Sequence, residues 1–218
     1  MSVQNNLLQI KATLPEYVTL VAVSKTKPVA DLMEAYHAGQ RIFGENKIQE
    51  MAEKFEMMPK DIQWHMIGHV QTNKVKFMAP FVNLIHGVDS LKLLEEINKQ
   101  ALKNNRVIDC LLQMHIAEED TKFGLNEKEL DEIIKLAHNN HFTNVKITGL
   151  MGMATFTDDK NQIKKEFLHL KSIFDRIKVE NSAIKTLSMG MSGDYQLAIE
   201  CGSTMVRIGS SIFGERNN

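Results

Sequence analysis

The chain has 218 residues, with 26 basic and 27 acidic side chains and a net charge of −1. This balance excludes a general binder of nucleic acid or of a membrane surface, because such proteins carry a basic excess. The sequence shows no signal peptide and no run of about 18 apolar residues, so we expect a cytoplasmic protein. Its length fits one domain over residues 1–218, and the near-zero net charge and lack of exposed heptads favour a monomer. Cys110 and Cys201 form no known pattern, so we expect them to be reduced and buried.

Eight short apolar segments alternate with amphipathic segments along the chain. Several of them are almost continuously apolar, which is typical of parallel strands that are covered on both faces. The predicted strands are 18–24, 41–45, 62–69, 82–88, 107–116, 145–153, 183–189 and 205–211. A short N-terminal helix is expected before the first of them.

Between the strands, apolar residues recur at three- and four-residue spacing, as in helices that bury one face. The predicted helices are 30–38, 47–57, 74–78, 91–103, 127–138, 163–177 and 195–201. Gly39 and Gly202 follow two of them, where a helix commonly ends. This alternation predicts an α/β fold, a single (β/α)8 TIM-type barrel. The alternative is an open doubly wound sheet, but no glycine-rich G-x-G-x-x-G follows the first strand.

In such a barrel, functional side chains lie at the C-terminal ends of the strands. Lys25 follows the first predicted strand on the same side as Val21 and Val23, so its side chain should point into the barrel mouth. Loss of hydration there lowers the pKa of a lysine and leaves a neutral amine that can form a Schiff base with an aldehyde. The alternative is charge pairing with a carboxylate such as Glu45 or Asp89.

Two glycine- and serine-rich loops follow the seventh and eighth predicted strands. Ser192 and Gly193 belong to the first loop, and Gly209 and Ser210 to the second. Loops in these two places of a barrel commonly bind phosphate through backbone N–H groups. The alternative is plain turn and helix-capping chemistry, which the same residue types also serve.

Arg207 lies within the last predicted strand, two residues before Gly209 and on the same face. A buried arginine is costly unless it is paired or faces a ligand. It could reach an aromatic nitrogen of a bound cofactor and keep that nitrogen unprotonated. The alternative is a buried ion pair with Glu200 or Glu45.

The lysine and the loops, taken with the segments around them, resemble a known family. The segments are VAVSKTKP (21–28), FGENKIQE (43–50), WHMIGHVQTNK (64–74), HGVDS (86–90), TKFGL (121–125), GLMGMAT (149–155), LSMGMSGDYQLAIECGST (187–204) and VRIGSSIFGER (206–216). They resemble the cofactor barrel of alanine racemases and, more closely, the pyridoxal phosphate homeostasis protein family, whose members are stand-alone forms of that barrel. The resemblance spans nearly the whole chain in order.

The resemblance implies a role for each candidate residue. Lys25 would hold pyridoxal 5′-phosphate (PLP) as a Schiff base, with Asn46 and Met151, or a neighbour of Met151, beside the ring. Arg207 would face the pyridine nitrogen. Lys122 would take part in handling the cofactor near the site. The phosphate group would be held by Ser192, Gly193, Gly209 and Ser210.

The resemblance also implies binding without catalysis: a protein that buffers PLP or delivers it to PLP-dependent apo-enzymes, and so acts in vitamin B6 homeostasis and amino-acid balance. Racemization needs a base on each face of the substrate carbon, and only Tyr195 of three tyrosines could approach the mouth. No metal site is predicted, because His65 and His69 have no third ligand nearby in sequence. Two alternatives stay open, a weak PLP-dependent amino-acid racemase and a barrel for an unrelated phosphorylated ligand.

Overall fold

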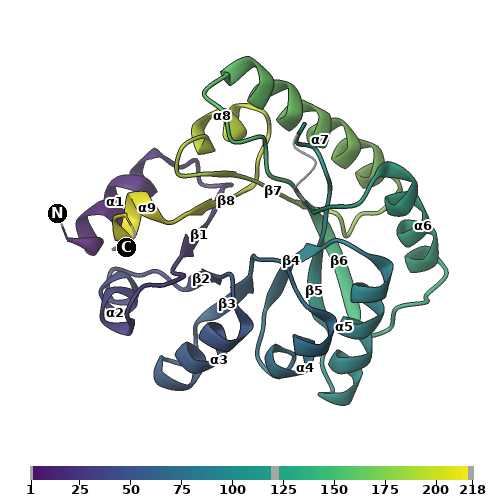
Figure 1. The fold of residues 1–218 in the computed structure, drawn as a ribbon, viewed down its shortest axis with the longest axis horizontal. Helices are drawn as coiled ribbons and strands as arrows, with labels where there is room; N and C mark the ends of the chain where they lie inside the picture. The colour runs from purple at the N-terminus through teal and green to yellow at the C-terminus, as the bar shows by residue number, and fades with distance from the viewer. Residues whose placement is uncertain (1, 119–122, 216–218) are drawn as a thin grey trace.

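A computed structural model describes residues 2–118 and 123–215. Its eight parallel strands close into a barrel in which each strand pairs with its neighbours in sequence and β8 pairs with β1 (Figure 1). The strands are β1 (Thr19–Val23), β2 (Ile42–Glu45), β3 (Gln63–Met66), β4 (Leu84–Val88), β5 (Ile108–Gln113), β6 (Val145–Met151), β7 (Thr186–Met191) and β8 (Met205–Ile208). This confirms the predicted barrel and excludes the open sheet.

The helices form a layer outside the strands (Figure 1). They are α1 (Val3–Thr13), α2 (Val29–His37), α3 (Ile48–Met57), η1 (Thr72–Lys74), α4 (Val75–Met78), α5 (Leu91–Lys103), α6 (Glu127–His138), α7 (Lys160–Glu180), α8 (Tyr195–Glu200) and α9 (Ser210–Phe213). The expected N-terminal helix is α1, which lies beside α9 and α2. Gly39 and Gly202 follow the ends of α2 and α8, as predicted, and both have a positive φ.

Two apolar layers stabilise the barrel. A small cluster fills its interior, formed by Val21, Leu84, Leu111, Met151 and Met205. A much larger cluster joins the outer faces of the strands to the helices. Because both faces of the strands are buried, their sequences are nearly continuously apolar rather than alternating.

Four predicted strands run past the observed C-terminal ends: 62–69, 107–116, 145–153 and 205–211. The segment 62–69 leaves the sheet after Met66, and a Cβ on Gly68 would lie 2.5 Å from the Asn46 carbonyl oxygen, so the backbone packs against the neighbouring loop instead. The segment 205–211 leaves the sheet after Ile208 and turns into α9. A helix of four residues is too short to produce a detectable period in the sequence.

Both cysteines are buried and free, as expected. Among the described residues, no helix combines the length and the apolar content that a membrane crossing requires.

Candidate functional site

Lys25 lies half-buried in a tight turn just beyond the end of β1. The next residue, Thr26, has a φ of 63°, in the left-handed region that a β-branched residue rarely adopts. The Thr26 N–H donates to Glu50 Oε1 at 2.6 Å. The turn that carries the lysine is therefore fixed from outside the barrel by a carboxylate of α3.

A buried ion cluster lies beneath this turn. Lys54 Nζ donates to Glu45 Oε1 at 2.8 Å, to Glu50 Oε1 at 2.7 Å and to the Ser24 carbonyl oxygen at 2.8 Å. The Ser24 hydroxyl donates to Glu45 Oε1 at 2.6 Å. Burial raises the pKa of the Glu45 carboxyl, and the ammonium of Lys54 opposes that shift. The sequence interpretation missed this cluster, although Glu50 and Lys54 stand at the i, i+4 spacing of a helical ion pair.

The carboxylates considered as partners of Lys25 are bonded to other side chains. Glu45 binds Lys54, and Asp89 Oδ2 lies 2.9 Å from His69 Nδ1. The second lysine of the turn, Lys27, also has partners within the fold. Lys27 Nζ donates to two backbone carbonyl oxygens after β8, those of Phe213 and Glu215, and ties the turn to the C-terminal segment.

The two predicted phosphate loops lie side by side next to β1. The Gly209 N–H donates to Ser192 Oγ at 3.2 Å, which joins them directly. A Cβ on Gly209 would lie 3.1 Å from the Val23 carbonyl oxygen, so glycine lets this loop approach the strand that carries Lys25. Gly193 has no atom within 4 Å of where its Cβ would be, and the Gly193 and Ser210 N–H groups donate to no described residue. The four residues thus form an open cradle of N–H and hydroxyl groups.

Arg207 is 4 % exposed in β8, and no described carboxylate lies within ion-pair distance of its guanidinium, although the charge of Asp194 after β7 acts on it from farther away. Its Nη1 donates to the Ser188 hydroxyl at 2.6 Å and to the Ser188 carbonyl oxygen at 3.0 Å, and its Nη2 donates to the Gly152 carbonyl oxygen at 3.2 Å. A guanidinium has five N–H groups, so two remain without a partner in the described part of the chain. Burial lowers the pKa of Arg207 to about 10, which leaves it charged at neutral pH. The predicted alternative of a pair with Glu200 or Glu45 is wrong.

The two residues predicted beside the cofactor ring, Asn46 and Met151, differ in their burial. Asn46 is half-buried just after β2, against the backbone of Gly68. Met151 is fully buried at the end of β6, within the apolar interior of the barrel. Lys122 lies outside the described residues, so its role stays a prediction.

None of the three tyrosines lies at the C-terminal mouth. The Tyr195 side chain is buried, and its hydroxyl lies 3.1 Å from the Thr13 hydroxyl of α1, in the outer layer. Tyr36 donates to Asp61, and Tyr17 precedes β1. The expectation that Tyr195 could approach the mouth is therefore wrong.

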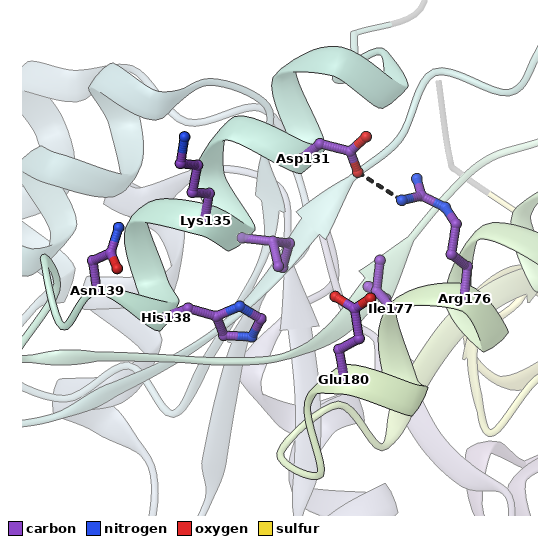
Figure 2. Close-up of a pocket in the computed structure, with 8 residues that line it drawn as sticks. Asp131, Lys135, His138, Asn139, Arg176, Ile177 and Glu180 are labelled. Carbon is purple, nitrogen blue, oxygen red and sulfur yellow. Dashed lines mark hydrogen bonds and ion pairs between the residues drawn. The ribbon is translucent and has the colours of Figure 1, made fainter.

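Two other hollows lie away from these groups. One, of about 470 Å³, lies between α6 and α7, where Asp131 and Arg176 form an ion pair across it (Figure 2). The other, of about 530 Å³, opens at the N-terminal ends of the strands. No group of three His, Cys, Asp or Glu side chains suited to a metal ion occurs in residues 2–118 and 123–215.

Known proteins are similar to this chain in sequence and in fold. The family model described as alanine racemase, N-terminal domain, matches residues 1–217. The pyridoxal phosphate homeostasis protein of Aquifex aeolicus is 40% identical over 199 residues, which cover 90% of this chain and 86% of that protein. The structure of PipY from Synechococcus elongatus with PLP bound has a TM-score of 0.88 and 32% identity, and the match covers 98% of this chain and all of that one. An alanine racemase of Clostridium difficile shares the fold, with a TM-score of 0.83 at 16% identity over 60% of its length.

Proposed function

Because the chain belongs to the alanine racemase N-terminal domain family, we propose that it binds PLP at the C-terminal mouth of the barrel, as a Schiff base on Lys25, and acts in intracellular PLP homeostasis without catalysing a reaction. The observation that carries this proposal is Arg207: a charged, buried side chain with two unused N–H groups and no carboxylate within ion-pair distance among the described residues. A buried cation in this state is expected to face a ligand that supplies the missing acceptor.

The other residues of the mouth fit the rest of the cofactor. The N–H groups of Gly193 and Ser210 and the hydroxyl of Ser192 can bind a phosphate, as loops in these places of a barrel commonly do. Asn46 is available beside the ring from β2, and Met151 closes the apolar floor below it. The guanidinium can donate to the pyridine nitrogen.

When bound, PLP supplies an aldehyde that condenses with a primary amine to form a C=N bond with loss of one water. Lys25 provides that amine. The turn that holds it is fixed by the carboxylate of Glu50 and, through the Ser24 carbonyl oxygen, by the ammonium of Lys54. These neighbours keep the lysine in place without binding the cofactor themselves.

Two features support binding without turnover. A guanidinium donates to the ring nitrogen without protonating it, and an unprotonated pyridine stabilises a substrate carbanion poorly. In addition, all three tyrosines, the side chains that could supply a second base, lie away from the mouth. We propose that this cytoplasmic, monomeric chain buffers PLP and hands it to PLP-dependent apo-enzymes.

An absorbance spectrum tests the proposal. The protein is purified with PLP and freed of excess, and the near-visible spectrum is recorded for wild type, Lys25→Ala and the control Lys47→Ala, which removes an exposed lysine two residues after the β2 strand end. We expect a Schiff-base band in wild type and Lys47→Ala and its complete loss in Lys25→Ala. A wild type without the band would contradict PLP binding, and a band that survives in Lys25→Ala would contradict the choice of lysine.

A second assay addresses catalysis. The loaded protein is offered an apo-enzyme that requires PLP and, separately, single L-amino acids. We expect activation of the apo-enzyme and no D-amino acid. Steady production of D-amino acid that disappears in Lys25→Ala would support the racemase alternative instead.

A further inference from the structure

Four polar side chains cross the interior of the barrel below the mouth. They are Arg207 of β8, Ser188 of β7, His86 of β4 and His65 of β3, and each is 4 % exposed or less. Arg207 Nη1 lies 2.6 Å from Ser188 Oγ, which lies 3.1 Å from His86 Nδ1. His86 Nε2 lies 3.1 Å from His65 Nδ1. Neighbours in this series are joined by hydrogen bonds from the cofactor side to the opposite end of the barrel.

The chemistry of these groups gives every bond one direction. A guanidinium can only donate, so Ser188 Oγ accepts from Arg207. The hydroxyl proton of Ser188 then needs an acceptor, and His86 Nδ1 is the one that the described residues provide. His86 accepts at Nδ1 and therefore carries its proton on Nε2, which donates to His65 Nδ1. By the same rule, His65 carries its proton on Nε2.

Both imidazoles are held neutral by their surroundings. Burial lowers the pKa of His65 to about 3. Burial, together with His65 and the charge of Arg207, lowers the pKa of His86 well below its usual range. A neutral imidazole is the form that can accept at one nitrogen and donate at the other, so the series works as a chain of donors over the ordinary pH range.

The series ends at the N-terminal face of the barrel. His65 lines the hollow of about 530 Å³, and its Nε2 bonds to no described residue. Asp109, Lys146 and Lys185 line the same hollow, which contains room for water. The last donor of the series therefore has access to solvent acceptors.

We propose that Ser188, His86 and His65 are positioning residues: they form a one-way hydrogen-bond relay that fixes Arg207 with its two free N–H groups toward the ring of the bound cofactor. The second half of this statement rests on the proposed function, whereas the direction of the relay does not. If His86 Nδ1 did not accept the Ser188 hydroxyl proton, that proton would point toward the N–H groups of Arg207. It would then weaken the bond from Arg207 to the Ser188 hydroxyl, one of the three bonds that hold the guanidinium.

The direction of the relay is testable without cofactor. The 15N spectrum of histidine-labelled wild-type protein at pH 7 should show His65 and His86 as neutral imidazoles protonated on Nε2. Assignment uses His65→Asn and Ser188→Ala, each of which changes the signals of one end of the series. A His86 protonated on Nδ1, or on both nitrogens, would overturn the proposal whether or not the protein binds PLP.

The effect of the relay on PLP binding at the mouth is tested with two substitutions of His65, the residue at the opposite end of the relay. His65→Leu removes the acceptor of His86, whereas His65→Asn keeps an acceptor near the position of Nδ1. We expect His65→Leu to weaken PLP binding by roughly 3- to 10-fold, as for the loss of one hydrogen bond, to shift the absorbance band and to move the His86 proton to Nδ1. His65→Asn should restore most of the affinity and the wild-type band.

Equal losses in both variants, or no loss in either, would overturn the relay as a positioning device. Circular dichroism first establishes that both variants fold, and if His65→Leu does not, the wild-type 15N spectrum decides. A wild type that binds no PLP but shows both imidazoles protonated on Nε2 would contradict the proposed function and leave the relay standing.

Discussion

Two buried cations flank the mouth of this barrel, and they differ in the kind of group to which they are bonded. Lys54, 5 % exposed beneath the β1 turn, is bonded to the carboxylates of Glu45 and Glu50. Arg207, 4 % exposed in β8, is bonded to two carbonyl oxygens and one hydroxyl. In the first region the cation is paired with carboxylates of the protein itself. In the second, the cation can still interact with a ligand.

The difference separates a structural role from a binding role. A buried charge with ionic partners is costly to break, because removal of one partner strands the other. A buried charge whose hydrogen bonds all go to neutral groups, with its nearest recorded carboxylate (Asp194) beyond ion-pair distance, has incurred a desolvation cost that a ligand can offset. Burial alone does not tell the two apart, but the identity of the partners does.

The largest effect is expected when the two cations are replaced by the same apolar side chain. Lys54→Met leaves the buried Glu45 without its cation and should lower the free energy of unfolding by about 3–5 kcal/mol. Arg207→Met in the cofactor-free protein should lower it by less than Lys54→Met does, since no carboxylate within ion-pair distance loses its cation. Urea unfolding of both variants, compared with wild type, measures the difference.

The double variant Glu45→Gln Lys54→Met is the control for this comparison. Because it removes both charges of the buried pair, it should be more stable than Lys54→Met alone. If Arg207→Met proves as destabilising as Lys54→Met, then Arg207 is a structural ion rather than one reserved for a ligand, and the contrast between the two regions fails.

The sequence predicted one of these regions far better than the other. The place of Arg207 followed from strand parity and its distance to Gly209, both of which are local. The Lys54 cluster joins β1, β2 and α3, and its members look like ordinary surface charges of a helix until α3 is docked. His86 and Ser188 were missed for the same reason, since their partners are 21 and 102 residues away along the chain.

The same limit explains the errors in the strands. Apolar runs predicted every strand, because both faces of a parallel strand are buried. The closed barrel was preferred to an open sheet because no G-x-G-x-x-G follows the first strand. The apolar runs did not show where each strand ends, since the residues after it stay partly apolar while they turn into the mouth. The site lies in those turns, so the least predictable segments of the fold are the ones that carry its chemistry.

Glu166 is another buried charge that has no ion-pair partner among the described residues, and its substitution gives a second test with an effect of intermediate size. Its carboxylate accepts from the Thr155 N–H at 2.7 Å, the Thr155 hydroxyl at 2.7 Å and the Glu118 N–H at 3.2 Å, and so fixes the loop after β6. Burial acts to raise the pKa of Glu166, but these hydrogen bonds hold it below its usual value. Glu166→Gln should lower the free energy of unfolding by about 1–3 kcal/mol at pH 7.

The sign of the pH dependence follows from the lowered pKa. A carboxyl whose pKa is lower in the folded state stabilises the fold above its ordinary pKa of about 4.3 and loses that contribution as the pH falls through the folded value. The stability difference between wild type and Glu166→Gln should therefore shrink as the pH falls from 7 to 3, as urea unfolding at both pH values would show. A difference that grows on acidification would contradict this assignment.

The smallest effect concerns the turn of Lys25 and tests which groups hold it. Thr26 has a φ of 63°, a conformation that costs a residue with a Cβ about 1–2 kcal/mol. Thr26→Gly removes that cost but adds chain entropy of about 0.5–1 kcal/mol to the unfolded state, so a net stabilisation of up to about 1 kcal/mol is expected. Asn105→Gly, at a φ of 52° after α5, is the matched control and should gain less, because asparagine tolerates this region. If the ion cluster holds the turn through the Thr26 N–H, glycine keeps that bond and the gain is observed. A loss of stability in Thr26→Gly would instead show that the threonine side chain holds the turn in place. The contrast between the two regions would then rest on Arg207 alone.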